Sequence, residues 1–461
     1  MRDVEVDGRR LDVHVSGGLV DAVGSDLTAG RDDEVLVGGG GALVPGLHDH
    51  HIHLMAAAAA DRSVHVGPPS VASAAELAGA LRRADDRLPP GAWLRAVGYH
   101  ESVAGALDRD ALDAHVPHRP VRLQHRTGMQ WVLNGPACRI VGLDDGPVPD
   151  GAETDASGRA TGRLLRADTW LRERVGTEEP PDLAALGRRL ASVGVTGVTD
   201  ATPVEHLDDL RLLAEARLPQ RLQLTGGVAL ADAPFPAGVQ RGPVKLVVSD
   251  HDLPSLDRLA GAVAAAHAAG RAVAVHCVTR VALVLALAAW DEAGSQAGDR
   301  IEHGSVVPAE LVPELAERGL VVVTQPGFVA ERGDQYLTDV DAEDQPHLYR
   351  CASLLAGGVA VAGSTDAPYG PWDPWQAMRA AVDRTTAAGH VLGAHERLAP
   401  RRALDLFLAP LDDPGGRPRR VGVGGPGDLM LLAEPLERVL VAPSPAAVVA
   451  TVVEGAVVAR N

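Results

Sequence analysis

Four histidines lie close together in residues 45–53, which read Pro-Gly-Leu-His-Asp-His-His-Ile-His. The whole chain holds 18 histidines among 461 residues, so this density is far above the average. Side chains two positions apart on a strand share one face, so His51 and His53 would stand side by side where a strand ends. Two neutral imidazoles in that arrangement can ligate a divalent metal such as zinc. The sequence therefore predicts a metal centre at this strand.

An alternative pair of histidines lies on the same strand. His48 and His50 are also two positions apart and would share the opposite face. His51 and His53 lie nearer the end of the strand, which is where parallel α/β proteins collect their functional residues. We therefore expect His51 and His53 to be the metal ligands.

Further polar residues follow apolar runs later in the chain, namely Lys245, His276, His303 and Asp366. About 30 residues separate Lys245 from His276 and His276 from His303, which is the length of one strand–helix repeat. Asp366 follows about two repeats later. Parallel strands in such repeats end on the same side, so these side chains are expected to converge on one site.

These residue types suit a hydrolytic metal centre. His276 and His303 can ligate the ion as neutral imidazoles, and His276 or a metal can polarise the bond that is attacked. Asp366 can ligate the metal, accept a proton from an activated water and pass it to the leaving nitrogen. Lys245 would repel a cation unless it is neutral, or carboxylated and bridging two metals. We therefore expect one or two zinc-like ions and attack of water on a carbonyl or amidine carbon.

Two nearby carboxylates are weaker candidates for the base. Glu302 alternates away from His303 along the strand, which makes it a supporting or helix-facing partner. Asp250 lies beyond Lys245 by an odd offset. The remaining histidines have no motif and are expected at the surface: His65, His100, His115, His118, His125, His267, His347, His390 and His395.

Strand and helix patterns alternate through the middle of the chain. Apolar runs predict eight strands, at 43–53, 194–201, 221–226, 243–249, 271–277, 300–304, 320–325 and 358–365. Helical patterns between them lie at 253–269, 281–293, 308–318 and 352–355. Eight such units favour a (β/α)8 TIM-like barrel over a doubly wound sheet.

The rest of the chain is expected to surround this barrel. We expect the barrel at 47–397, with an insertion at about 54–193 that acts as a substrate lid. Residues 1–46 and 398–461 read as short strands separated by glycine-rich turns. The two ends are therefore predicted to pair into a small β-sandwich domain.

Composition limits the partners. The net charge of −18 argues against nucleic acid and anionic membranes, so a small-molecule substrate is expected. No apolar stretch is long enough to span a membrane, and the acidic start does not suit a signal peptide. Cys138, Cys277 and Cys351 match no disulfide framework and suit a reducing compartment. We expect a cytoplasmic enzyme that is free to form a homo-oligomer.

Aromatic residues make up only 3% of the chain. Trp131, Tyr369, Trp372 and Trp375 are expected in loops near the end of the barrel that holds the metal. We expect Trp131, Tyr369 or Trp372 to contact the substrate, because aromatic side chains commonly line ligand pockets.

The combined motifs resemble the amidohydrolase superfamily. They are Pro45-Gly46 with Asp49, His51-Ile-His53, Val244-Lys245, Val-Ala-Val-His276, Arg300-Ile-Glu-His303 and Gly-Ser-Thr-Asp366-Ala-Pro. Gly98-Tyr-His-Glu101, the segment 107–113 and Gly158-Arg-Ala-Thr-Gly-Arg-Leu-Leu165 resemble more narrowly the YtcJ-like group that includes N-substituted formamide deformylases. This resemblance implies a metal-dependent hydrolase of C–N bonds, usually with zinc. Met129 stands where a histidine is usual in that group, which indicates a different substrate pocket.

Two other functions are compatible with the same barrel. A deaminase of a heterocycle generally has a glutamate near the fifth-strand histidine, whereas here His276 is followed by Cys-Val-Thr. A regulatory or binding relative without turnover would have no need to keep every ligand. Both alternatives rank below hydrolysis of an amide-like bond.

Overall fold

The computed structural model describes residues 1–461 except 32, 147, 177–180 and 251. The described residues form two compact units. Unit 1 consists of Met1–Met55 and Leu183–Asn461, and unit 2 consists of Ala56–Asp182. Unit 2 therefore interrupts unit 1 in the region where an insertion was predicted, and its action as a lid stays a prediction.

Unit 1 contains two sheets in which all neighbouring strands are parallel. The first has the order β14 (Val239–Arg241), β13 (Arg221–Leu224), β12 (Val195–Asp200), β5 (Leu47–Ile52). The second has the order β15 (Val244–Val247), β16 (Val273–Cys277), β17 (Arg300–His303), β18 (Val321–Thr324), β19 (Ala360–Gly363). Each of the eight predicted strands overlaps an observed one, and the predicted α/β class with parallel sheets is confirmed.

Backbone hydrogen bonds link the ends of these two sheets. The N–H of Lys245 in β15 donates to the carbonyl of Gly226, just after β13, over 2.8 Å. On the other side, the N–H of Asp366 donates to the carbonyl of His51 over 2.8 Å. The N–H of His53 donates to the carbonyl of Ala367 over 2.9 Å. The first and last strands of the parallel series are therefore in direct contact where the predicted ligands lie.

The helices between the strands begin at identifiable caps. Ser255 accepts a hydrogen bond from the Arg258 N–H and Thr279 accepts one from the Ala282 N–H, as N-cap residues do. The helices predicted from the sequence are α9 (Leu256–Ala268), α10 (Arg280–Ala293), α11 (Val312–Glu317) and α13 (Ala352–Ala356). Among the helices that were not predicted are α8 (Leu207–Glu215), α12 (Gly327–Asp339) and α14 (Pro374–Asp383).

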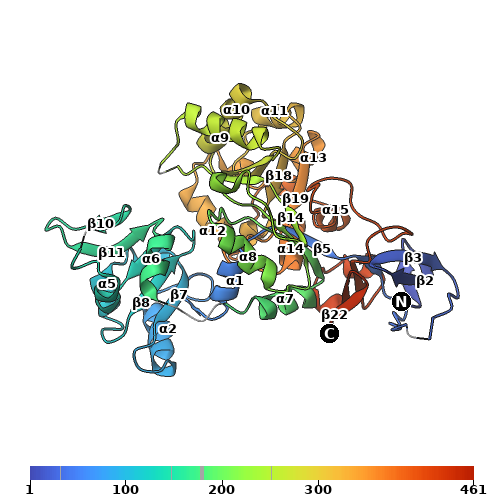
Figure 1. Cartoon of the computed structure of the whole chain (residues 1–461), viewed down its shortest axis with the longest axis horizontal. Helices are drawn as coiled ribbons and strands as arrows, with labels where there is room; N and C mark the ends of the chain where they lie inside the picture. The colour runs from blue at the N-terminus through green and yellow to red at the C-terminus, as the bar shows by residue number, and fades with distance from the viewer. Residues whose placement is uncertain (32, 147, 177–180, 251) are drawn as a thin grey trace. The chain divides into compact units, whose positions relative to one another are not determined.

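Strands from the two ends of the chain share one core. One sheet has the order β1 (Val4–Val6), β2 (Arg9–Ser16), β3 (Leu19–Gly24), and another has the order β22 (Ala456–Arg460), β21 (Val448–Val453), β20 (Leu429–Leu432), β4 (Leu43–Pro45). Val13 and Val20 pack in one buried cluster with Leu429 and Val452. Figure 1 shows the red strand β22 near the blue strands β2 and β3.

Unit 2 has its own sheet, which was not predicted. Its order is β10 (Ala152–Thr154), β11 (Ala160–Leu165), β9 (Gln130–Leu133), β8 (Val121–His125), β7 (Leu94–Tyr99), β6 (Val64–His65). Strands β6, β7 and β8 are parallel. A helix, α2 (Ala74–Arg87), lies near the start of this segment. Within the part of the chain that the structure describes, no helix has the length and apolar character needed to cross a bilayer.

Candidate metal centre

Strand β5 places its histidines with the help of a register shift. Val198 of β12 pairs with Asp49 and Asp200 pairs with Ile52, so β5 carries one extra residue between these two pairs. Such a bulge re-aims side chains along one strand. His48 is directed elsewhere, because its Nδ1 lies 2.8 Å from the carbonyl oxygen of Ala409.

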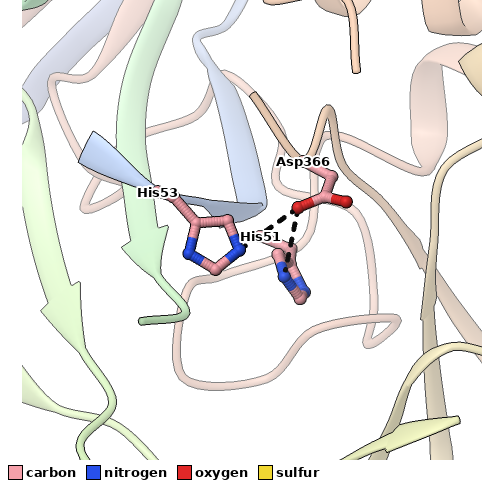
Figure 2. Close-up of side chains that lie close together, drawn as sticks. All are labelled: His51, His53 and Asp366. Carbon is pink, nitrogen blue, oxygen red and sulfur yellow. Dashed lines mark ion pairs between the residues drawn. The ribbon is translucent and has the colours of Figure 1, made fainter. Parts of the chain in front are cut away.

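His51 and His53 converge on Asp366, as Figure 2 shows. Their Nε2 atoms lie 3.5 and 3.3 Å from Oδ1 of Asp366. The ligand atoms of these three residues all lie within 4.8 Å of one another, a separation that one metal ion can bridge. Asp366 follows β19 in the left-handed region, with φ 56°. An aspartate tolerates this conformation better than most residues, and it turns the carboxylate toward β5.

Glu302 of β17 supports His51 from the opposite side. An oxygen of its carboxylate contacts Nδ1 of His51, and its other oxygen accepts a hydrogen bond of 2.6 Å from Nε of Arg300. A proton on Nδ1 then leaves the lone pair of Nε2 directed at Asp366, which is the arrangement found around metal-binding histidines. The prediction of a supporting role agrees with this contact. The alternative expectation, that Glu302 faces a helix, does not agree with this contact.

The backbone at the end of β17 departs from a regular strand. His303 has φ 72°, so strict alternation of side chains ends at this residue. Its ring lies 4.8 Å from the ring of His51 and 4.4 Å from the ring of His276, measured between centroids. The structure thus brings His276 and His303 together with His51.

Residues that were not singled out from the sequence hold these ligands in place. Nδ1 of His303 lies 2.9 Å from Oε1 of Gln325, whose amide nitrogen donates to Ser364 over 2.9 Å. Nδ1 of His53 lies 3.0 Å from the hydroxyl of Thr202. Gln325 and Thr202 follow β18 and β12 closely, so a search for polar residues just after every strand would have found them.

Asp49 ties the first strand to the segment that carries Asp366. It accepts hydrogen bonds from the backbone N–H of Thr365 at 3.0 Å and from the Thr365 hydroxyl at 2.5 Å. Burial raises the pKa of Asp49 to about 7. Asp49 therefore acts on the position of Asp366 through Thr365 and does not itself face the ligand atoms.

Lys245 is buried in β15, with 4% of its surface exposed. Burial lowers the pKa of its ammonium group, and the charge of Arg300 lowers it further. Among the described residues, its Nζ has no hydrogen-bond partner. A buried amine without a partner is costly as a cation, which fits a neutral or chemically modified lysine.

Burial also keeps the histidines neutral. It lowers the pKa of His51 to about 3, and it lowers the pKa of His276 and His303. Burial alone would raise the pKa of Asp366, but its contact with His53 and the other neighbouring imidazoles holds that pKa below its usual value. Neutral imidazoles beside an ionised carboxylate are the donor set that a divalent cation requires.

The aromatic candidates lie in different places. The ring of Tyr369 is 5.2 Å from the ring of His53, between centroids. Trp372 stacks under the guanidinium of Arg189 at 4.7 Å. Trp131 lies in strand β9 of unit 2, not in a loop, and its indole N–H donates to Asp168 over 2.8 Å. Trp375 also lies outside a loop, within α14. Contact of Trp131, Tyr369 or Trp372 with substrate stays a prediction.

The chemistry of the donor set fits a divalent metal. Nε2 of His51 and Oδ1 of Asp366 are both buried without a hydrogen-bond partner in the described part of the chain. Unsatisfied buried polar atoms are rare and costly, so two of them 3.5 Å apart indicate a missing positive partner. A metal ion between them would satisfy both.

Comparison with known proteins agrees with this geometry. The chain is 28% identical over 456 residues to an N-substituted formamide deformylase of Arthrobacter pascens, covering 86% of this chain and 84% of the relative. It is 23% identical to a putative amidohydrolase, YtcJ, of Bacillus subtilis (strain 168), covering 81% and 80%. An uncharacterized metal-dependent hydrolase from Pyrococcus horikoshii shares the fold with a TM-score of 0.72 and 20% identity, over 96% of this chain and 94% of that one. The model of the amidohydrolase family matches residues 39–459, and the chain therefore belongs to the amidohydrolase family.

Proposed function

We propose that this chain hydrolyses a non-peptide, amide-like C–N bond of a small molecule with the help of a divalent metal. The observation that carries the proposal is the convergence of His51, His53 and Asp366, whose ligand atoms lie within 4.8 Å of one another. Family membership supports the reaction class, because the match spans residues 39–459. The name of the Arthrobacter pascens relative supports formamide-like compounds as the first substrates to test.

The metal would be held by His51, His53, His276, His303 and Asp366, and we propose zinc because imidazole and carboxylate suit it. When bound, such an ion lowers the pKa of a water molecule and polarises the carbonyl oxygen. Asp366 accepts the proton of the attacking water and carries it to the leaving nitrogen. As an alternative to ligating the metal, His276 would donate a hydrogen bond to the oxygen on which charge develops. Tyr369 and Trp372 are proposed to line the approach of the substrate.

We also propose that the parallel strands form a (β/α)8 barrel over 47–397, interrupted by the insertion at about 54–193. Residues 1–46 and 398–461 would form a β-sandwich beside it. The contacts that join β5 to the segment after β19 support closure, because a barrel has no free edge there. Three free, buried cysteines support a reducing cytoplasm as the location.

A combined metal and substrate assay tests the function. The purified chain is loaded with zinc after chelation, and its metal content is measured by mass spectrometry. It is then screened against N-formyl, N-acyl and cyclic amide compounds, with separate detection of carboxylate and of ammonia. Carboxylate release that depends on metal supports the proposal. Ammonia release from heterocycles alone would favour a deaminase, and no turnover with a full metal site would favour a binding protein.

Glu302→Gln should weaken zinc binding by about 10- to 100-fold, the effect that loss of a ligand's supporting carboxylate commonly has. Glutamine keeps the shape of the side chain but cannot hold the proton on Nδ1 of His51 as strongly. The measurement is competition with a chromophoric chelator. Glu434→Gln, at an exposed position, is the matched control. Equal affinities for both variants and the wild type would contradict the role of Glu302.

Lys245 should carry a carbamate when the site is loaded with two metals. The buried Nζ without a described hydrogen-bond partner is the reason for this expectation. Protein loaded in ¹³C-bicarbonate should show a carbamate carbon signal by NMR, and Lys245→Ala should lose that signal together with about one metal per chain. A wild-type protein without the signal and with a single metal would reject the bridging role.

A further inference from the structure

A second group of metal-binding residue types lies within unit 2. We propose that His100, Glu101 and His125 form a further binding site for a zinc-class divalent ion. Their ligand atoms lie within 4.8 Å of one another, as close as those of His51, His53 and Asp366. The two groups share no residue, so the proposal does not depend on the function assigned to unit 1.

Two parallel strands position these histidines. Strands β7 and β8 pair in parallel, and Tyr99 at the end of β7 is opposite His125 at the end of β8. The N–H of Arg126 donates to the carbonyl of Tyr99 over 2.8 Å, which fixes the two strand ends together. His100 follows β7 directly, so both imidazoles leave the sheet at its carboxyl edge. That edge is where parallel α/β sheets commonly bind ligands.

The side chains face one another at this edge. Nε2 of His125 lies 3.0 Å from Oε2 of Glu101, and Nε2 of His100 lies 4.0 Å from the same oxygen. The two imidazole rings are 5.8 Å apart between centroids. Two imidazoles and one carboxylate are a recurrent zinc donor set, in which the fourth position stays open to water or a ligand.

Hydroxyl groups hold the other nitrogen of each ring. Nδ1 of His100 lies 2.9 Å from the Ser102 hydroxyl, and Nδ1 of His125 lies 2.8 Å from the Thr127 hydroxyl. When Nδ1 donates to the hydroxyl, Nε2 keeps its lone pair for a metal. The backbone N–H groups of Ser102 and Thr127 also lie 3.2 Å from these Nδ1 atoms. When these N–H groups donate to Nδ1, the ring proton lies on Nε2 instead. The two tautomers of each ring are therefore expected to differ in their affinity for zinc.

Exposure suits a site that exchanges its ion with solvent. The side chains of His100 and His125 are only 15% and 14% exposed, whereas that of Glu101 is 47% exposed. The two histidines therefore form the fixed part of the site, and Glu101 faces the solution. Burial raises the pKa of Glu101, but the contacts with His125 and His100 and a backbone hydrogen bond together lower it below its usual value.

The test counts zinc in the full-length chain after the first site has been removed. The His51→Ala/His53→Ala variant is stripped with chelator and titrated with zinc by calorimetry. One equivalent should still bind, and adding His100→Ala and His125→Ala should abolish it. His118→Ala, which changes another histidine of unit 2, is the control and should keep the equivalent. Absorption at the zinc edge should show two imidazole ligands in the bound ion.

A variant that preserves the fold completes the test. Glu101→Gln in the His51→Ala/His53→Ala background should bind zinc at least 10-fold more weakly, and circular dichroism should match the parent. The proposal is overturned if the His51→Ala/His53→Ala variant binds no zinc. It is also overturned if binding persists after His100 and His125 have been replaced.

Discussion

Asp366→Asn should retain most of its metal and lose about 10²-fold or more of kcat, because asparagine can still ligate through oxygen but cannot carry a proton. An amide nitrogen leaves poorly as an anion, so its protonation is required for cleavage. Asparagine also tolerates the left-handed backbone at this position, where φ is 56°. The loss should therefore reflect chemistry and not a disturbed fold.

The measurement pairs metal content with steady-state kinetics on the best substrate of the screen. Asp383→Asn, on an exposed residue at the end of α14, is the control and should leave kcat unchanged. Substrates with better leaving groups should lose less activity in Asp366→Asn, since they need less proton transfer. A metal-loaded variant that turns over at the wild-type rate would show that another group carries the proton.

His51→Ala/His53→Ala should empty the first metal site and abolish hydrolysis. Each histidine places Nε2 within 3.5 Å of Oδ1 of Asp366, so the double change removes two of the three converging ligands. Affinity should fall below the range that survives gel filtration, because Asp366, His276 and His303 would remain without the two imidazoles that lie closest to Oδ1 of Asp366.

The control for this variant is His390→Ala/His395→Ala. These two side chains are 64% and 58% exposed, and they should keep full metal content and activity. Thermal unfolding of the chelator-treated proteins checks that the loss of zinc is not a loss of fold. A full complement of metal at the first site in His51→Ala/His53→Ala would overturn the assignment of its ligands.

The sequence predicted most of unit 1 because buried parallel strands read as continuous apolar runs. β16 and β18, for example, are dominated by valine, and their bounds were predicted within about two residues. β14 was missed because Val-Gln-Arg carries no apolar run. α12 was missed because glycine and polar residues interrupt its apolar face.

The convergence of the candidate ligands could also be predicted, but the local backbone around them could not. His51 and His303 followed from residue type and spacing. The left-handed conformation of His303 is encoded by no periodic pattern. The shift in register within β5 is a property of two paired strands, so it cannot be read from one of them. The pairing of His100 with His125 likewise required the register of two parallel strands.

The contact between Asp49 and Thr365 has a consequence for biosynthesis. These residues are 316 positions apart, and the bonds between them help to bring Asp366 to His51. The ribosome therefore has to synthesise most of the chain before the centre in unit 1 can assemble, because contacts between residues far apart in the sequence form late. Nascent fragments that end before residue 366 would bind zinc at that centre weakly, even with both histidines of β5 present. Loading of the ion there should accordingly be a post-translational event, and a cell starved of zinc would accumulate full-length apoprotein and not truncated chains.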